Sequence, residues 1–121
     1  MKQLRCVVIL LGIAACLGTP GCRDRASEED CRAACRNSVQ LSYWSDFDDA
    51  YEQSGRGPRG RERERERGER QLERALSEDG ELHETLEGCV TVCRRTPTDP
   101  EIVACQIEAQ SPSQLNRCVA R

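Results

Sequence analysis

The sequence predicts an all-α fold, in which a disulfide-stapled antiparallel helical hairpin is followed by two short helices. Two observations lead to this prediction: the paired spacing of four cysteines, and apolar residues that recur every three or four positions. Cys31 and Cys35 form one C-x3-C pair, and Cys89 and Cys93 form another. Each pair places two thiols one helical turn apart, as two helices joined by two disulfides require.

Residues 1–21 are typical of a secretory signal peptide of the lipoprotein type. A short basic start precedes an apolar run at 6–17, which is too short to span a bilayer. Cys22 and Cys16 are the two candidates for lipidation, and the residues before Cys16 match the bacterial lipobox better. Length and parity favour Cys22, because its lipidation leaves six further cysteines for three disulfides. An ordinary cleaved signal with a soluble product is the remaining alternative.

Charge and composition narrow the range of functions. The chain has 18 basic and 21 acidic residues, a net charge of −3, and loss of Lys2 and Arg5 with the signal leaves −5. This balance argues against binding to nucleic acid or to anionic lipid. After a polar tether at 22–26, residues 27–121 suffice for one cysteine-rich helical domain. Its apolar residues are few, so it needs disulfides, which persist in exported proteins.

The first helix is expected at about 28–53. Ser27 is a suitable N-cap, and the acidic residues after it favour the helix dipole. All aromatic residues of the chain lie within this helix, at Tyr43, Trp44, Phe47 and Tyr51. We interpret them as the core of the hairpin, with a partly exposed patch that binds a partner as the alternative. Four aromatics on one helix cannot all face inward, and Tyr43 is expected to point outward.

A charged tip at 54–68 separates the two long helices. Glycine and proline in its first part indicate a turn, and the chain from Arg61 to Arg67 then alternates arginine and glutamate. In a helix this alternation sets opposite charges three residues apart and like charges four apart, so the two effects partly cancel. We expect a solvated tip, helical or frayed, with a binding arm as the alternative.

The second helix is expected at about 69–94 and ends before Pro97. Its apolar residues keep an alternating three-and-four spacing across Gly80, which favours one continuous helix. The predicted seam packs one set of residues, Leu41, Trp44, Phe47 and Tyr51, against another, Leu72, Leu76, Leu82 and Leu86.

The disulfide pairing follows from the geometry of an antiparallel hairpin, in which facing residues have a constant index sum. Cys31 with Cys93 gives a sum of 124, and Cys35 with Cys89 gives the same sum. Six cysteines allow fifteen connectivities, and the spacing makes this pairing the leading choice. The same sum sets Trp44 opposite Gly80 and places Leu41 near Leu82.

Two short helices are expected in the C-terminal part. Asp99 and Pro100 favour the start of the first, because proline is suited to an initial helical position. Ser111 begins an S-x-x-Q capping box that favours the start of the second. A disulfide between Cys105 and Cys118 is expected to close this unit.

Residues 31–93 resemble the twin C-x3-C helical hairpins of the coiled-coil-helix class, which includes small chaperones of the mitochondrial intermembrane space. The four motif cysteines match, with 53 residues between the two pairs. This resemblance implies the hairpin geometry and, as a functional option, a holdase-type chaperone. The whole chain resembles uncharacterised small cysteine-rich bacterial lipoproteins, a resemblance that implies no activity.

The sequence contains no catalytic constellation, and the protein is expected not to be an enzyme and to need no cofactor. Four cysteines on two helices suit zinc ligation or thiol redox chemistry, but export favours disulfides over both. His83 is the only histidine and is expected to face solvent or the edge of the seam. No small-molecule substrate is evident.

These features together favour a non-enzymatic, membrane-tethered lipoprotein with a structural or protein-interaction role in the cell envelope. Its expected partners are the lipid bilayer, through an N-terminal acyl anchor, and an envelope protein. Arg23, rather than aspartate, follows Cys22, so the resemblance to enterobacterial lipoproteins implies the outer membrane. A periplasmic holdase is the main alternative, and a thiol redox or metal-binding protein is the lesser one.

Overall fold

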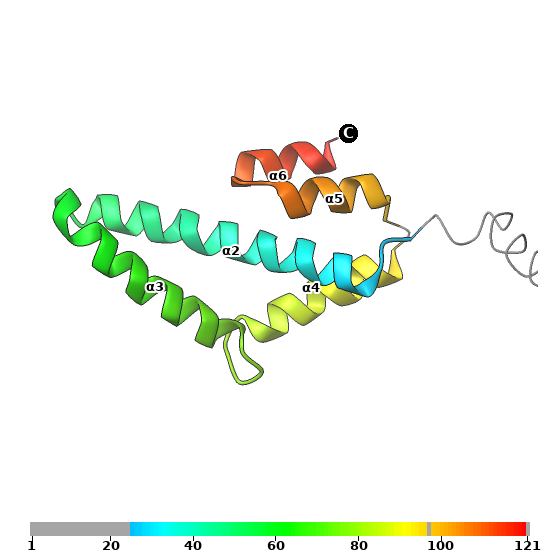
Figure 1. Ribbon diagram of the computed structural model, residues 1–121, viewed down its shortest axis with the longest axis horizontal. Helices are drawn as coiled ribbons and strands as arrows, with labels where there is room; N and C mark the ends of the chain where they lie inside the picture. Colours follow the sequence, from blue (N-terminus) through cyan, green and yellow to red (C-terminus); the bar gives the residue numbers. More distant parts are fainter. Residues whose placement is uncertain (1–24, 97, 121) are drawn as a thin grey trace, which may run out of the picture.

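The computed structural model describes residues 25–96 and 98–120. The signal peptide expected at 1–21 and both lipidation candidates, Cys16 and Cys22, lie outside the described residues. The regular structure of the described chain is helical throughout, and the all-α prediction is confirmed. Its elements are α2 (Glu28–Gln53), the short 3₁₀ helix η1 (Pro58–Gly60), α3 (Arg61–Leu76), α4 (His83–Arg95), α5 (Pro100–Glu108) and α6 (Pro112–Val119) (Figure 1).

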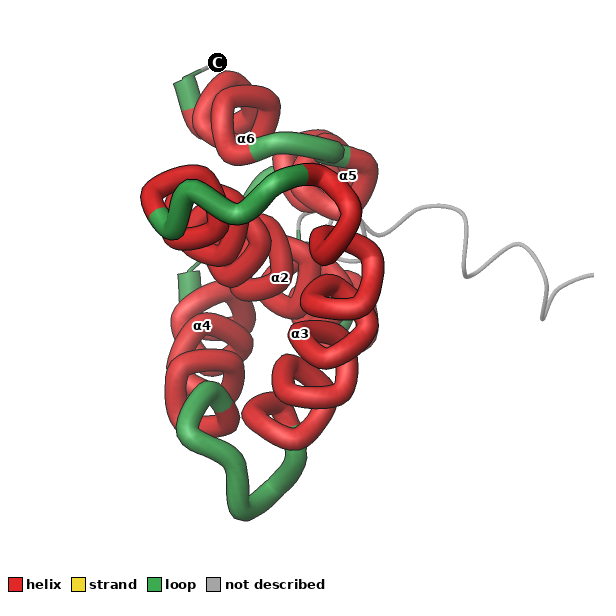
Figure 2. Tube along the Cα trace, turned by 90° about the vertical axis from the view of Figure 1, so that its left-hand side faces the viewer, coloured by secondary structure: helices red, strands yellow, loops and turns green. Residues whose placement is uncertain are grey.

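The helices form three layers with α2 in the middle (Figure 1, Figure 2). On one side of α2, α3 and α4 follow one another and together return along its length, meeting at an angle near their shared turn. On the opposite side, α5 and α6 pack together and against α2. The long helix is therefore covered on two faces, which is how a short chain with few apolar residues buries a core.

The starts of α2, α5 and α6 are capped as the sequence predicts. The Ser27 hydroxyl accepts a hydrogen bond from the Asp30 N–H at 3.0 Å. Asp99 caps α5 in the same way at 2.8 Å, and Ser111 caps α6 at 3.3 Å. Each cap satisfies one of the N–H groups that a helix start leaves without a partner, so these boundaries are set locally.

The second arm of the hairpin is broken, so the expectation of one continuous helix across Gly80 is wrong. The turn between α3 and α4 is closed by hydrogen bonds of 2.8 Å from the Gly80 N–H to the Ser77 carbonyl and from the Leu82 N–H to the Ala75 carbonyl. A Cβ at position 80 would lie 2.2 Å from the Ala75 carbonyl oxygen. Glycine is required there because two stretches of backbone approach closely.

This turn also changes the register of the hairpin. At the disulfides the index sum is 124, as predicted. Where α2 meets α3, the Trp44 ring lies 3.1 Å from the position that a Cβ of Gly68 would take, and this pair sums to 112. Arg61 lies over Tyr51 with the same sum. The indole therefore faces Gly68 rather than Gly80, because the turn takes residues out of the seam.

The buried core lies where α2, α3 and α4 meet. Its buried members are Cys35, Leu72, Leu76, Leu86 and Val90. Half-buried side chains pack against them, namely Val39, Tyr43, Trp44, Leu82, Cys89 and Cys93. The four leucines and Trp44 of the predicted seam are confirmed. Leu41 does not belong to this cluster, and Val39 and Tyr43 accompany Leu82 in its place.

Asn37 fastens α5 to α2, and we expect its replacement by aspartate to destabilise the fold. Its side-chain amide donates to the carbonyls of Gln106 at 2.8 Å and Ala109 at 2.9 Å. In Asn37→Asp a carboxylate faces those carbonyls, so the expected cost is about 1–3 kcal/mol in urea unfolding. Gln71→Glu is the matched control at an exposed position, where a change beyond about 0.5 kcal/mol is not expected.

Candidate functional site

Three disulfides hold the described chain together, and the predicted pairing is confirmed. They are Cys31–Cys93 and Cys35–Cys89 between α2 and α4, and Cys105–Cys118 between α5 and α6. This number of disulfides indicates an oxidising compartment outside the cytoplasm. Zinc ligation and thiol catalysis both require thiolates, and these six sulfur atoms are not thiolates while they form disulfides.

A groove follows the seam between α2 and α4, beside the disulfides. One hollow has a volume of about 370 Å³ and is lined by Ala34, Cys35, Ser38, Gly88, Cys89, Val92, Cys93, Thr98 and Gln106. An adjoining hollow of about 320 Å³ is lined by Ser38, Val39, Ser42, Tyr43, Asp46, Leu82 and Thr85. Ser38 lines both hollows, so they lie next to each other along α2, and we call the two together the groove; Gln106 of α5 lines one end of it.

Small side chains create this groove. On α2, Ala34, Ser38 and Ser42 are spaced four residues apart and share one face of the helix. On α4, a Cβ at Gly88 would have no atom within 4 Å apart from its chain neighbours and the nearby backbone of α4 itself. The disulfides keep the two helices together, but these residues do not fill the space between them. The sequence shows these small residues, but the spacing of large apolar residues does not reveal them.

The surface of the groove is mainly apolar and uncharged. Among the described residues, Asp46 is the one charged residue that lines it. Val92 is 63% exposed at its rim, and Tyr43 and Leu82 lie at its other end. Exposed apolar surface of this kind is typical of protein-binding sites, and the groove offers no set of charged groups to orient a small ionic substrate.

The aromatic residues lie between α2 and α3, as the core interpretation predicts. The rings of Tyr43 and Trp44, and those of Trp44 and Phe47, meet edge to face with centroids 5.2 Å apart. Tyr51 stacks on Phe47 at 6.3 Å and is buried. Tyr43 does not point outward, because its hydroxyl donates a 3.2 Å hydrogen bond to the carbonyl of Gly68. The row therefore forms the core of the distal half of the hairpin.

Two arginines of the alternating run cover this aromatic row. The Arg65 guanidinium lies 4.6 Å from the centroid of the Trp44 ring. Arg61 lies 5.7 Å from the centroid of Tyr51 and pairs with Asp48 at 2.8 Å. Such cation–π contacts contribute about 0.5–1 kcal/mol each at exposed sites. The alternating run is helical from its first residue, so it is not frayed.

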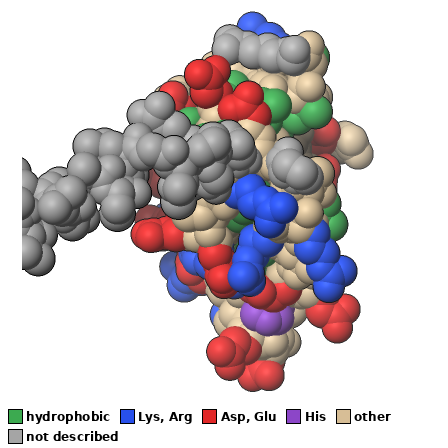
Figure 3. All heavy atoms as spheres, turned by 90° about the vertical axis from the view of Figure 1, so that its right-hand side faces the viewer, with side chains coloured by type: hydrophobic (Ala, Val, Ile, Leu, Met, Phe, Trp, Pro, Cys, Tyr) green, Lys and Arg blue, Asp and Glu red, His purple; other side chains and the backbone are tan. Residues whose placement is uncertain are grey.

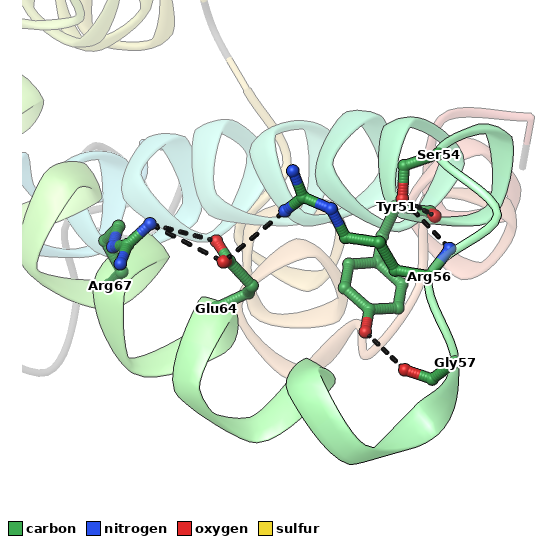
Figure 4. A network of polar contacts seen from close by, with 6 residues as sticks. All are labelled: Tyr51, Ser54, Arg56, Gly57, Glu64 and Arg67. Atoms are coloured by element: carbon green, nitrogen blue, oxygen red, sulfur yellow. Dashed lines mark hydrogen bonds and ion pairs between the residues drawn. The ribbon is translucent and has the colours of Figure 1, made fainter.

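Polar contacts also tie the turn before α3 to the neighbouring helices (Figure 4). The Glu64 carboxylate accepts hydrogen bonds of 3.4 Å from both Arg56 and Arg67. The Tyr51 hydroxyl donates to the Gly57 carbonyl at 2.8 Å. The predicted charged tip is thus an ordered part of the fold.

A separate polar hollow of about 520 Å³ is lined by Arg32, Arg36, Leu76, Ser77, Glu78, His83, Leu86 and Glu87. Arg32 donates two hydrogen bonds to Glu87, which lower the pKa of that carboxyl, and Arg36 pairs with Glu73 at 3.1 Å. His83 is half-buried in this lining, and acidic and basic side chains are mixed over the face that Figure 3 shows. Because both arginines already have carboxylate partners, this hollow is a weaker candidate than the groove.

In residues 25–96 and 98–120, no helix has the length and apolar character needed to cross a membrane. The same residues contain no group of three or more potential metal ligands. Comparisons of the chain with protein-family models, with curated proteins and with solved structures found no match. The groove, the disulfides and the N-terminal sequence are therefore the features of the chain that bear on its function.

Proposed function

We propose that the protein is an exported, non-enzymatic lipoprotein that presents the groove between α2 and α4 to a protein partner in the cell envelope. The groove is the observation that carries this proposal, since it is largely apolar and bordered by two disulfides. Walls fixed by covalent bonds keep the groove in one shape before a partner arrives. This preorganisation reduces the entropy that binding would otherwise cost.

The proposed anchor is a lipid on Cys22, and the proposed location is the outer membrane. A multiply acylated N-terminus holds a small domain stably on a bilayer, whereas one acyl chain holds it weakly. The tether at 22–26 spans at most roughly 18 Å when extended. It would therefore keep the start of α2 close to the membrane and the groove within reach of neighbouring envelope proteins.

Site-specific photo-crosslinking in the native host tests the groove. A photoreactive residue at Val92 should give one discrete adduct with an envelope protein. The matched control is Val119, which is 66% exposed on α6 and does not line the groove. Absence of any adduct at Val92, or equal adducts at both positions, would contradict a partner in the groove.

Intact mass of the protein recovered from its host tests the anchor and the disulfides. The expected product carries acyl chains on Cys22 and six cysteines that alkylate only after reduction. Cys22→Ala should abolish the acyl mass, whereas Cys16→Ala should keep it. An unacylated product would overturn the anchor, and thiols that alkylate before reduction would overturn the stapled scaffold.

A periplasmic holdase is the second candidate, and the exposed apolar rim at Val92 favours it. The purified protein would then suppress aggregation of an unfolded client at stoichiometric amounts. Val92→Asp should reduce that suppression severalfold, while Thr91→Asp, also exposed on α4, should leave it unchanged. Equal activity of the two variants would exclude the groove as the client-binding surface.

A further inference from the structure

The outer face of α3 carries two charged rows of opposite sign with the same spacing. Four glutamate–arginine dyads recur at intervals of four, three and four residues, at 62–63, 66–67, 69–70 and 73–74. This spacing keeps equivalent residues on one face of a helix. The glutamates therefore form one row and the arginines a second row, about 100° further round the helix.

The packing of α3 fixes the direction of these rows. Gly68, Leu72, Ala75 and Leu76 are buried on the inner face of α3. Helical geometry places the midline between the two rows about 150° from that buried face. All eight residues of the dyads are exposed, and α3 forms an outer edge of the molecule (Figure 1). A partner could reach both rows together without displacing any packed side chain.

Most of these charges are open. Glu73 pairs with Arg36, and Arg67 pairs with Glu64. In the part of the chain that the structure describes, no ion pair is formed by the remaining members Glu62, Arg63, Glu66, Glu69, Arg70 and Arg74. Open charges of both signs in fixed register match a surface that carries the same two rows.

The geometry points to a second copy of this chain as the partner, with two α3 helices side by side and parallel. A two-fold axis parallel to the helices sets the arginine row of each copy against the glutamate row of the other. Facing residues then differ in height by one residue, about 1.5 Å, which both long side chains can span. An antiparallel pair sets arginine against arginine and is disfavoured by like-charge repulsion.

Other occupants use this surface less well. An anionic membrane would attract the arginine row but would be repelled by the glutamate row and by the net charge of −3. An acidic protein would engage only one of the two rows. Because the pairs are exposed and charged, the association is weak and sensitive to salt. It requires neither the acyl anchor nor the groove, so it is independent of the proposed function.

Sedimentation equilibrium of the full chain, in density-matched detergent, tests this proposal with a charge-swap pair. The acidic variant is Arg63→Glu with Arg70→Glu, and the basic variant is Glu62→Arg with Glu69→Arg, which are the residues that face them. The wild-type protein should dimerise, with a dissociation constant that rises about tenfold or more between low and high salt. Each variant alone should be monomeric, whereas their equimolar mixture should form a heterodimer.

The control for the acidic variant is Arg95→Glu with Arg117→Glu, because it makes the same change in net charge on exposed residues outside α3. This control should dimerise like the wild-type protein. Circular dichroism should show that every variant keeps its helices. The cysteines of every variant should resist alkylation before reduction, which shows that the disulfides are intact. A monomeric wild-type protein at low salt, variants that still dimerise alone, or a mixture that stays monomeric would each overturn the proposal.

Discussion

Removal of both disulfides between α2 and α4 is expected to cost more than the sum of the two separate removals. Each bridge by itself closes a long loop, with sequence separations of 62 and 54 residues. Closure of such a loop stabilises the fold by about 4 kcal/mol in the chain-entropy model. When one bridge is present, the other closes only a ring of roughly eight residues, which contributes about 2.5 kcal/mol.

The expected free energies of unfolding follow from this nesting. A variant that lacks one of these disulfides should lose about 2.5 kcal/mol in free energy of unfolding, whether it carries Cys31→Ala with Cys93→Ala or Cys35→Ala with Cys89→Ala. The variant with all four substitutions should lose about 6.5 kcal/mol. The excess over additivity is therefore about 1.5 kcal/mol in a double-mutant cycle. Urea unfolding measures it, and added osmolyte keeps the weakest variant folded in the measurement.

The disulfide between Cys105 and Cys118 provides the control for this cycle. It closes a separate loop with a sequence separation of 13 residues, so it is not nested with the others. When it is removed together with one of the nested disulfides, the loss in free energy of unfolding should equal the sum of the two separate losses to within about 0.5 kcal/mol. Strict additivity of the two nested bridges would show that their effect is local strain or packing and not loop closure.

Among the glycines that the structure describes, Gly80 is expected to be the one whose replacement by alanine is most damaging. The added Cβ would lie 2.2 Å from the Ala75 carbonyl oxygen and 2.4 Å from the Arg74 carbonyl oxygen, both in the backbone. The turn must open to accept it, which weakens the hydrogen bonds that Gly80 and Leu82 donate. The expected loss is about 2–4 kcal/mol in the free energy of unfolding.

Gly88→Ala is the matched control, and it should raise the stability of the fold where Gly80→Ala lowers it. Gly88 lies within α4, and the added Cβ would have no atom within 4 Å apart from its chain neighbours and the nearby backbone of α4 itself. Alanine should stabilise the helix there by up to about 1 kcal/mol. Thermal unfolding of the two variants measures both effects. If Gly80→Ala were as stable as the parent, the close backbone approach at this turn would not be a constraint.

The elements set by local chemistry were predictable from the sequence. Ser27, Asp99 and Ser111 cap the helices that the sequence predicts, because a cap depends on residues within one turn. The disulfide pairing was also predictable, since two C-x3-C pairs on antiparallel helices have one arrangement with a constant index sum. Such features need no knowledge of how distant segments pack.

The break between α3 and α4 was not predictable in the same way. The apolar spacing continues across Gly80, so periodicity alone favours a continuous helix. In the fold, a turn at this point lets Trp44 pack on Gly68 while the disulfides hold α4 in place. The groove was missed for a related reason, because an unfilled space depends on how two helices approach.

The sequence by itself determined the all-α class, the caps of α2, α5 and α6, the pairing of the six cysteines and the oxidising compartment that this pairing indicates. Only the tertiary structure decided three other features: the register of α3 on α2, the inward direction of Tyr43, and the groove beside the disulfides. The physical reason is that hydrogen bonds and spacing within one turn are encoded locally. Register and cavities arise from volumes that residues far apart in the chain must fill together.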